Sequence, residues 1–245
     1  MGESMTADTV RITGDGGDEV EAYVARPSEE RARGGVVVIH HMPGYDRATK
    51  EIVRRFAELG YDAICPNLHG REAPSAPPAE ASAAVRARGG VPDQRLIGDV
   101  GGAATYLRSL PTANGKVGVI GYCSGGRQAV LAACNLEVDA AVDCYGAFVV
   151  GTPPEGSRIR NLVDQLPRLG CPLLGLFGNQ DSHPTPAEVD ELDEILTAHG
   201  KPHEFHRYDD AGHAFFAVDR PSYRVAAAND GWERVAAFYE THLGD

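Results

Sequence analysis

Continuous apolar stretches alternate with amphipathic stretches along most of this chain. The β-branched run 35–40 predicts a strand buried on both faces, and the spacing of apolar residues in 49–59 predicts a helix directly after it. The same patterns predict further strands at 61–66, 116–120, 138–144, 172–177 and 203–208, and further helices at 93–110, 124–134, 186–199 and 222–243. Such alternation predicts an α/β fold with a mostly parallel, twisted sheet and helices on both faces.

The beginning of the chain and two later segments depart from this alternation. Residues 10–12 and 20–25, joined by a turn rich in glycine and aspartate at 14–17, predict an antiparallel edge of the sheet. Residues 70–92 are crowded with Ala, Pro, Gly and Arg, and residues 145–170 carry two adjacent prolines and scattered charges. We expect each of the two segments to be a loop, a short helix or a cap over the site.

Length and charge narrow the class of protein. With 245 residues, 42% of them hydrophobic, the chain can form a single domain over 1–245. The net charge of -12, from 35 acidic and 23 basic residues, argues against nucleic acid or an anionic membrane as a partner. No apolar stretch approaches the roughly 20 residues that span a bilayer. We therefore expect a small-molecule substrate.

The cysteines indicate the compartment. The chain has five, an odd number, without a C-x-x-C motif, and residues 1–6 lack the basic and apolar stretches of a secretory signal. A reducing cytoplasm fits these features.

The most informative motif is Gly121-Tyr122-Cys123-Ser124-Gly125-Gly126, directly after the apolar run 116–120. It has the pattern of the G-x-S-x-G nucleophile elbow, with sulfur in place of oxygen. Small flanking residues let a strand and a helix approach closely while the central residue is exposed at the bend. The motif predicts covalent catalysis by a Cys123 thiolate. The other cysteines lie in or beside apolar segments without bracketing glycines, which favours structural thiols: Cys65, Cys134, Cys144 and Cys171.

A thiolate nucleophile needs a base, and the base needs an orienting acid. Asp181 follows the strand 172–177, and His213 follows the strand 203–208. The order nucleophile, acid, histidine is the one that α/β-hydrolases use. Rival acids are Asp209, Asp210 and Asp143.

An oxyanion intermediate also needs hydrogen-bond donors. In this architecture they are the backbone amide after the nucleophile and an amide from the loop after an earlier strand, which here are Ser124 and Met42. The helix that begins at Ser124 directs its positive end toward Cys123 and should depress the pKa of the thiol.

From about residue 35 to its carboxyl terminus, the chain resembles the dienelactone hydrolases (carboxymethylenebutenolidases). The most specific matching segments are 121–126, 177–181, 211–216 and 220–223. The resemblance implies an α/β-hydrolase fold without a cofactor, and a carboxylic ester hydrolase that acts on a small ester or lactone. It also implies that Cys123 is the nucleophile, His213 the base and Asp181 its orienting acid.

The chain departs from this family at two positions. Members that act on dienelactone carry a glutamate that helps to activate the thiol, and the matching position here is His41. An arginine expected shortly after the histidine, to bind a substrate carboxylate, is replaced by Ala217. The remaining candidates for activation or substrate contact are His41 and Tyr122, with Arg220, Arg88, Arg86 or Arg95 as the substitute arginine.

Other functions stay open at this point. Five histidines near strand ends raise the question of a metal site, but adjacent residues such as His40 and His41 point to opposite faces of an extended chain. We therefore expect no metal. A non-hydrolytic member that binds or cyclises a ligand, and a general carboxylesterase or thioesterase, are the alternatives. The sequence is compatible with a monomer or a homodimer.

Overall fold

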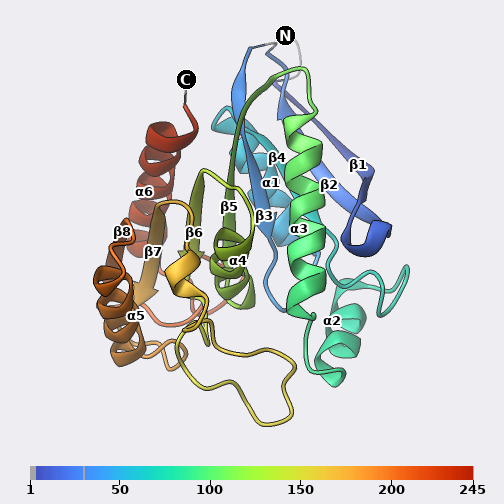
Figure 1. The fold of residues 1–245 in the computed structure, drawn as a ribbon. Coiled ribbons are helices and arrows are strands. Elements are labelled where there is room, and N and C mark those ends of the chain that lie inside the picture. The colour runs from blue at the N-terminus through green and yellow to red at the C-terminus, as the bar shows by residue number, and fades with distance from the viewer. Residues whose placement is uncertain (1–3, 30, 245) are drawn as a thin grey trace.

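The computed structural model describes residues 4–29 and 31–244. Met1–Glu3, which belong to the segment that lacks the features of a secretory signal, lie outside the described residues. Within those ranges, eight strands and six α-helices follow one another (Figure 1). The strands are β1 (Met5–Thr13), β2 (Glu19–Pro27), β3 (Arg33–Ile39), β4 (Asp62–Pro66), β5 (Ala113–Tyr122), β6 (Ala140–Cys144), β7 (Leu173–Gly178) and β8 (His203–Tyr208). The helices are α1 (Arg47–Glu58), α2 (Pro78–Ala87), α3 (Asp93–Arg108), α4 (Ser124–Asn135), α5 (Pro186–Ala198) and α6 (Val225–Leu243).

All eight strands belong to one sheet, in the order β1-β2-β4-β3-β5-β6-β7-β8. β1 pairs antiparallel with β2, and β2 pairs antiparallel with β4. The pairs from β4 through β3 to β8 are parallel. The predicted antiparallel edge and the mostly parallel sheet are therefore confirmed.

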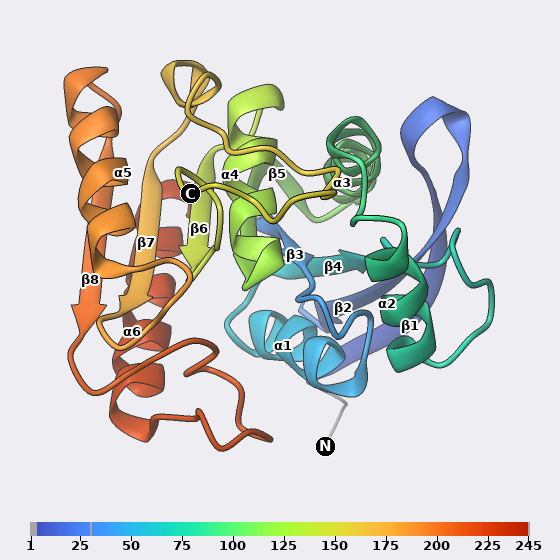
Figure 2. The same cartoon turned by 90° about the horizontal axis from the view of Figure 1, so that it is seen from below.

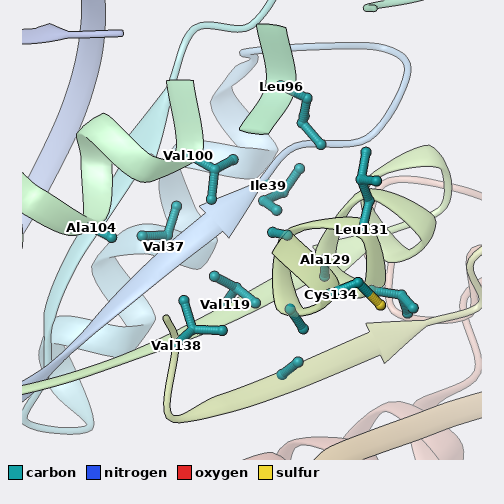
Figure 3. Packing of buried hydrophobic residues seen from close by; sticks show 14 of the residues in the cluster. Val37, Ile39, Leu96, Val100, Ala104, Val119, Ala129, Leu131, Cys134 and Val138 are labelled. Atoms are coloured by element: carbon teal, nitrogen blue, oxygen red, sulfur yellow. The ribbon is translucent and has the colours of Figure 1, made fainter. Parts of the chain in front are cut away.

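Helices cover both faces of the sheet, as predicted. Figure 2 shows α1 and α6 on one side and α3 and α4 on the other, and each side has its own buried apolar cluster. In the cluster beneath α3 and α4, Val37, Ile39 and Val119 of the sheet meet side chains from both helices (Figure 3). The alternating directions of side chains along a strand explain this division, because Val36 and Val38 lie in the opposite cluster.

The parallel strands bring distant parts of the sequence to one edge. β3, β5, β7 and β8 end at the same side of the sheet, so the loops that follow them lie near one another. These loops carry the candidate residues Met42, Cys123, Asp181 and His213. The fold therefore gathers the predicted chemistry at the carboxyl ends of the strands.

Some boundaries differ from the predictions. The segment 70–92 contains α2, whereas 145–170 contains a single 3-10 turn at Leu166–Arg168. The last helix begins at Val225, not at residue 222, because the backbone N–H of Arg224 donates to Phe215 O (3.1 Å) and holds the preceding residues in a turn. Among the described residues, no helix is long and apolar enough to cross a membrane.

Candidate active site

Cys123 lies at a sharp bend between β5 and α4. Its φ of 58° and ψ of -121° place a non-glycine residue in a strained conformation. Two glycines make the bend possible. A Cβ on Gly121 would lie 1.8 Å from the carbonyl oxygen of Gly125, and a Cβ on Gly125 would lie 2.4 Å from the carbonyl oxygen of Ile39. Close backbone contacts therefore require glycine at these two positions of the motif, and the turn from β5 into α4 has the geometry of a nucleophile elbow.

The five cysteines fall into two environments. All are free thiols, and Cys123 is partly exposed whereas the others are buried. Burial raises the pKa of the buried thiols, to about 11 for Cys134 and about 12 for Cys171, and further for the remaining two, Cys65 and Cys144. Figure 3 shows Cys134 among the apolar side chains beneath α3 and α4. Burial also acts to raise the pKa of Cys123, but His213 and two backbone N–H groups outweigh it, so that pKa lies below its ordinary value of 9.0.

His213 is oriented by Asp181. Its Nδ1 donates to Asp181 Oδ2 at 2.8 Å, and the other carboxylate oxygen accepts from the backbone N–H of His183 at 2.9 Å. The Asp181 side chain is 1% exposed and the His213 ring is 34% exposed. Burial alone would lower the pKa of His213, but hydrogen bonding to Asp181 and interaction with Cys123 raise it to about 10. The imidazole therefore favours its charged form beside the sulfur.

Among the described residues, none of the rival acids is hydrogen-bonded to His213. The Asp209 carboxylate accepts from the Asn179 side chain at 2.6 Å. Asp143 is fully buried, where its carboxylate accepts from the Gly146 N–H at 2.7 Å. Of the four candidate acids, Asp181 is the one that contacts His213.

Two backbone N–H groups face the sulfur. Those of Ser124 and Met42 act on Cys123 as hydrogen-bond donors and help to lower the pKa of its thiol. One comes from the first residue of α4 and the other from the loop after β3. Donors placed at the nucleophile can hold the negative oxygen that forms when it adds to a carbonyl group.

His40 and His41 have separate surroundings. His40 is buried, and its ring nitrogens contact His41 O (2.9 Å) and the backbone N–H of Leu68 (3.3 Å). His41 Nε2 donates to Asp46 Oδ2 at 2.9 Å, and the other oxygen of that carboxylate caps α1 through the N–H of Thr49. Within the described part of the chain, no cluster of three or more His, Cys, Asp or Glu side chains could hold a metal.

A cavity of about 420 Å³ opens at Cys123. Its walls come from Met42, Ser124 and the amino-terminal part of α4, and from both segments of irregular sequence: 86–91 on one side and 147–159 on the other. The apolar wall residues Phe148 and Ile159 belong to no motif, so nothing in the sequence marks them as part of a site. A larger cavity of about 530 Å³ lies between the β1–β2 hairpin and the loop 67–78, away from Cys123.

The candidate arginines are dispersed. Arg86 lines the Cys123 cavity, whereas Arg88 and Arg220 are exposed and outside its wall. Arg95 is paired with Glu72 at 2.6 Å. Arg127 also lines the cavity, but Asp93 binds it through two hydrogen bonds. Arg86 is therefore the cavity-lining guanidinium without a carboxylate partner among the described residues.

Replacing Gly125 with Ala should destabilise the fold by about 2 kcal/mol or more, because the new methyl group meets a backbone oxygen that no side-chain rotation can relieve. Ester turnover should fall with it, since α4 and the Met42 loop would be forced apart. Thermal unfolding and an ester assay measure both effects. In the matched control Gly101→Ala, the Cβ would lie 3.3 Å from the flexible Leu136 side chain, and stability should hold or increase. Equal stability of the two variants would contradict the contact.

The pH dependence of thiol alkylation should report the interaction between Cys123 and His213. Reaction with iodoacetamide should be half-maximal below pH 9, because the charged imidazole favours the thiolate. In Asp181→Asn, the pKa of His213 falls, the thiolate loses support, and the midpoint should move to higher pH. Asp209→Asn is the control, because that carboxylate contacts Asn179 instead of the imidazole. Identical midpoints in all three proteins would refute the arrangement.

Comparison with known proteins identifies the family. The dienelactone hydrolase family matches residues 20–243. A provisionally named carboxymethylenebutenolidase from Methylorubrum extorquens is 33% identical over 226 residues, which cover 91% of this chain and 77% of that protein. One from Salmonella typhimurium, with the same provisional name, is 33% identical over 93% of this chain and 85% of its own length.

A solved structure agrees with this assignment. The crystal structure of a provisionally named dienelactone hydrolase from Klebsiella pneumoniae is 28% identical, covers 98% of this chain and all of its own, and superposes with a TM-score of 0.87. The fold, the elbow and the sequence relationship lead to one conclusion: the chain belongs to the dienelactone hydrolase family of α/β-hydrolases and is a carboxylic ester hydrolase.

Proposed function

We propose that this enzyme hydrolyses a small ester or lactone through a Cys123 thiolate and an acyl-enzyme intermediate. The observation that carries the proposal is the arrangement of three side chains: Cys123 stands at the bend before α4, and His213 beside it donates to Asp181 at 2.8 Å. In this arrangement the pKa of Cys123 is lowered and that of His213 is raised. In such a pair the thiolate is the nucleophile, and the neighbouring imidazolium is a proton donor already in position. Asp181, nearly inaccessible to water, supports the charged imidazole.

The proposed reaction has two halves. The thiolate adds to the ester carbonyl, and the N–H groups of Ser124 and Met42 hold the resulting oxyanion. The tetrahedral intermediate collapses, its carbon–oxygen bond breaks, and His213 gives its proton to the leaving alkoxide. Neutral His213 then takes a proton from water, which attacks the thioester. When the second intermediate collapses, the carboxylic acid leaves and the thiolate and imidazolium are restored.

The cavity supports a small substrate. Its volume of about 420 Å³ lies within the range of pockets that bind small molecules. The relatives' names support an unsaturated lactone or a similar ester as the substrate class. We further propose that 70–92 and 145–170 are cap-forming segments of a single domain, because each contributes one wall of this cavity. Arg86 takes the place of Arg88 or Arg220 as the proposed contact for an anionic substrate.

Replacing Cys123 with Ala should lower ester turnover by about 10⁴-fold or more while the fold is kept, because no other group can form the acyl-enzyme. The measurement is p-nitrophenyl acetate hydrolysis, with circular dichroism to verify folding. Cys134→Ala, near the end of the helix that follows Cys123, is the control and should stay active. Mass spectrometry of the quenched wild-type protein should detect one acetyl adduct, on Cys123. Full activity of Cys123→Ala would rule out the mechanism.

Arg86 should affect anionic substrates selectively. In Arg86→Met, we expect KM for 4-nitrophenyl hydrogen succinate to rise about threefold, the scale of an exposed ion pair. KM for the similarly sized, neutral 4-nitrophenyl butyrate should hardly change. Arg88→Met is the matched control, since that exposed side chain is two residues away and outside the cavity wall. The same rise for both esters, or in both variants, would remove Arg86 from the substrate site.

A further inference from the structure

A second cavity, of about 170 Å³, lies on the other side of the nucleophile from the Cys123 cavity. Its helical walls come from α1 and α6, whereas α4 and the segment 145–170 form the walls of the first. The loop 216–219, a few residues after His213, closes a third side. Figure 2 shows α1 and α6 on one face of the sheet and α4 on the other, so the helices that line the two cavities cover opposite faces.

The second cavity begins close to the reacting groups. Tyr122 lines it and directly precedes Cys123 in the chain. Tyr145 also lines it, and the centroid of the Tyr145 ring is 5.2 Å from that of the His213 ring. A group attached to the oxygen that His213 protonates would therefore lie within reach of this cavity.

Its walls are aromatic and held in place. The Phe216 ring meets the rings of Tyr122 and Trp232 edge to face, with centroids 5.8 and 5.9 Å apart. Helix α6 approaches so closely that a Cβ on Gly231 would lie 2.4 Å from the Phe216 ring. The space is therefore preformed. Its size is close to that of an engineered apolar protein cavity of about 150 Å³ that binds benzene.

One polar group in the wall lacks a partner. The hydroxyl of Tyr122 is buried and has no hydrogen-bond partner among the described residues. Burial raises the pKa of Tyr122, so the phenol remains protonated and can donate. An unsatisfied buried hydroxyl is unfavourable, and an acceptor atom on a ligand would satisfy it.

The charges at the rim favour a neutral ligand. Arg55 places its guanidinium carbon 4.1 Å from the centroid of the Trp232 ring. Glu51 and Asp219 line the same cavity, and because Glu51 is paired with Arg54, Asp219 is left to balance the positive charge of Arg55. His41 at the inner end is bonded to Asp46. A flat, neutral ring that carries an acceptor atom suits this combination of walls, hydroxyl and charge.

We propose that the second cavity binds the alcohol part of the substrate, as a single flat ring with a hydrogen-bond acceptor to which Tyr122 donates. The acyl part would lie in the Cys123 cavity, so that the ester bond spans the sulfur and His213. This inference rests on the proposed ester hydrolysis and adds the class of substrate: esters of neutral aryl or similarly flat, unsaturated alcohols.

Binding can be measured without catalysis. Trp232 is the only tryptophan of the chain, and it lines the cavity. In a Cys123→Ala background, 4-methoxybenzyl alcohol should change its fluorescence saturably, whereas 2-methoxyethanol, which has the acceptor but no ring, should not. Adding Tyr122→Phe should weaken binding about threefold to tenfold, the range for one hydrogen bond. Tyr45→Phe is the control, because it removes another buried hydroxyl without a partner in the described structure, one that lies outside this cavity. Absence of a saturable response overturns the proposal.

Catalysis supplies the second test. Ala217→Phe should fill the cavity and lower kcat/KM for 4-methoxybenzyl acetate about tenfold more than kcat/KM for 2-methoxyethyl acetate, which has no ring to place there. An equal fall for both esters, or for neither, refutes the alcohol site even if Cys123→Ala is inactive. Conversely, activity that survives Cys123→Ala refutes the proposed mechanism, and the fluorescence titration still decides whether the cavity binds a ring.

Discussion

The contact between Asp181 and His213 is the interaction on which the proposed chemistry of this site depends. A carboxylate that is almost entirely shielded from water holds one imidazole nitrogen, and the ring is thereby charged and correctly turned beside the sulfur. Electrostatic interactions strengthen as water is excluded, so the burial of Asp181 matters as much as its distance. Without this contact, the desolvation of Cys123 would favour a neutral, unreactive thiol.

The scaffold holds Cys123, the proposed nucleophile, in a strained conformation by fixing the backbone on both sides of it. A cysteine at positive φ is unfavourable by about 1–3 kcal/mol, yet Cys123 is fixed by the strand before it, the helix after it and a backbone hydrogen bond to Cys144 O at 3.0 Å. The glycines on either side allow α4 to rest against the end of β3. That contact also brings the Met42 loop to the sulfur. The strained backbone of Cys123 and the position of the Met42 N–H group therefore have the same structural cause.

The two cavities near Cys123 have walls of different chemical character. The larger one is bounded by the irregular segments and is lined by Arg86, whereas the smaller one is aromatic and is lined by Tyr122; neither the guanidinium nor the phenol has a partner among the described residues. Family membership assigns the reaction class, and we propose that these walls select which ester fits. His41 stands where relatives active on dienelactone are expected to carry a glutamate, and here its bond to Asp46 ties it to the start of α1.

The sequence by itself determined the parts of this protein that depend on local patterns. Apolar periodicity predicted the strands and most helices, and the glycine brackets around Cys123 predicted the elbow, because both follow from short-range sterics and burial. Asp181 and His213 were predicted from their positions after strands and from the family resemblance, but only the tertiary structure shows that Asp181, and not Asp143 or Asp209, contacts the imidazole. The same holds for Arg86 and for the Tyr122 cavity. Their environments are formed by segments far apart in the chain, and burial, pairing and cavity shape exist only once those segments are packed together.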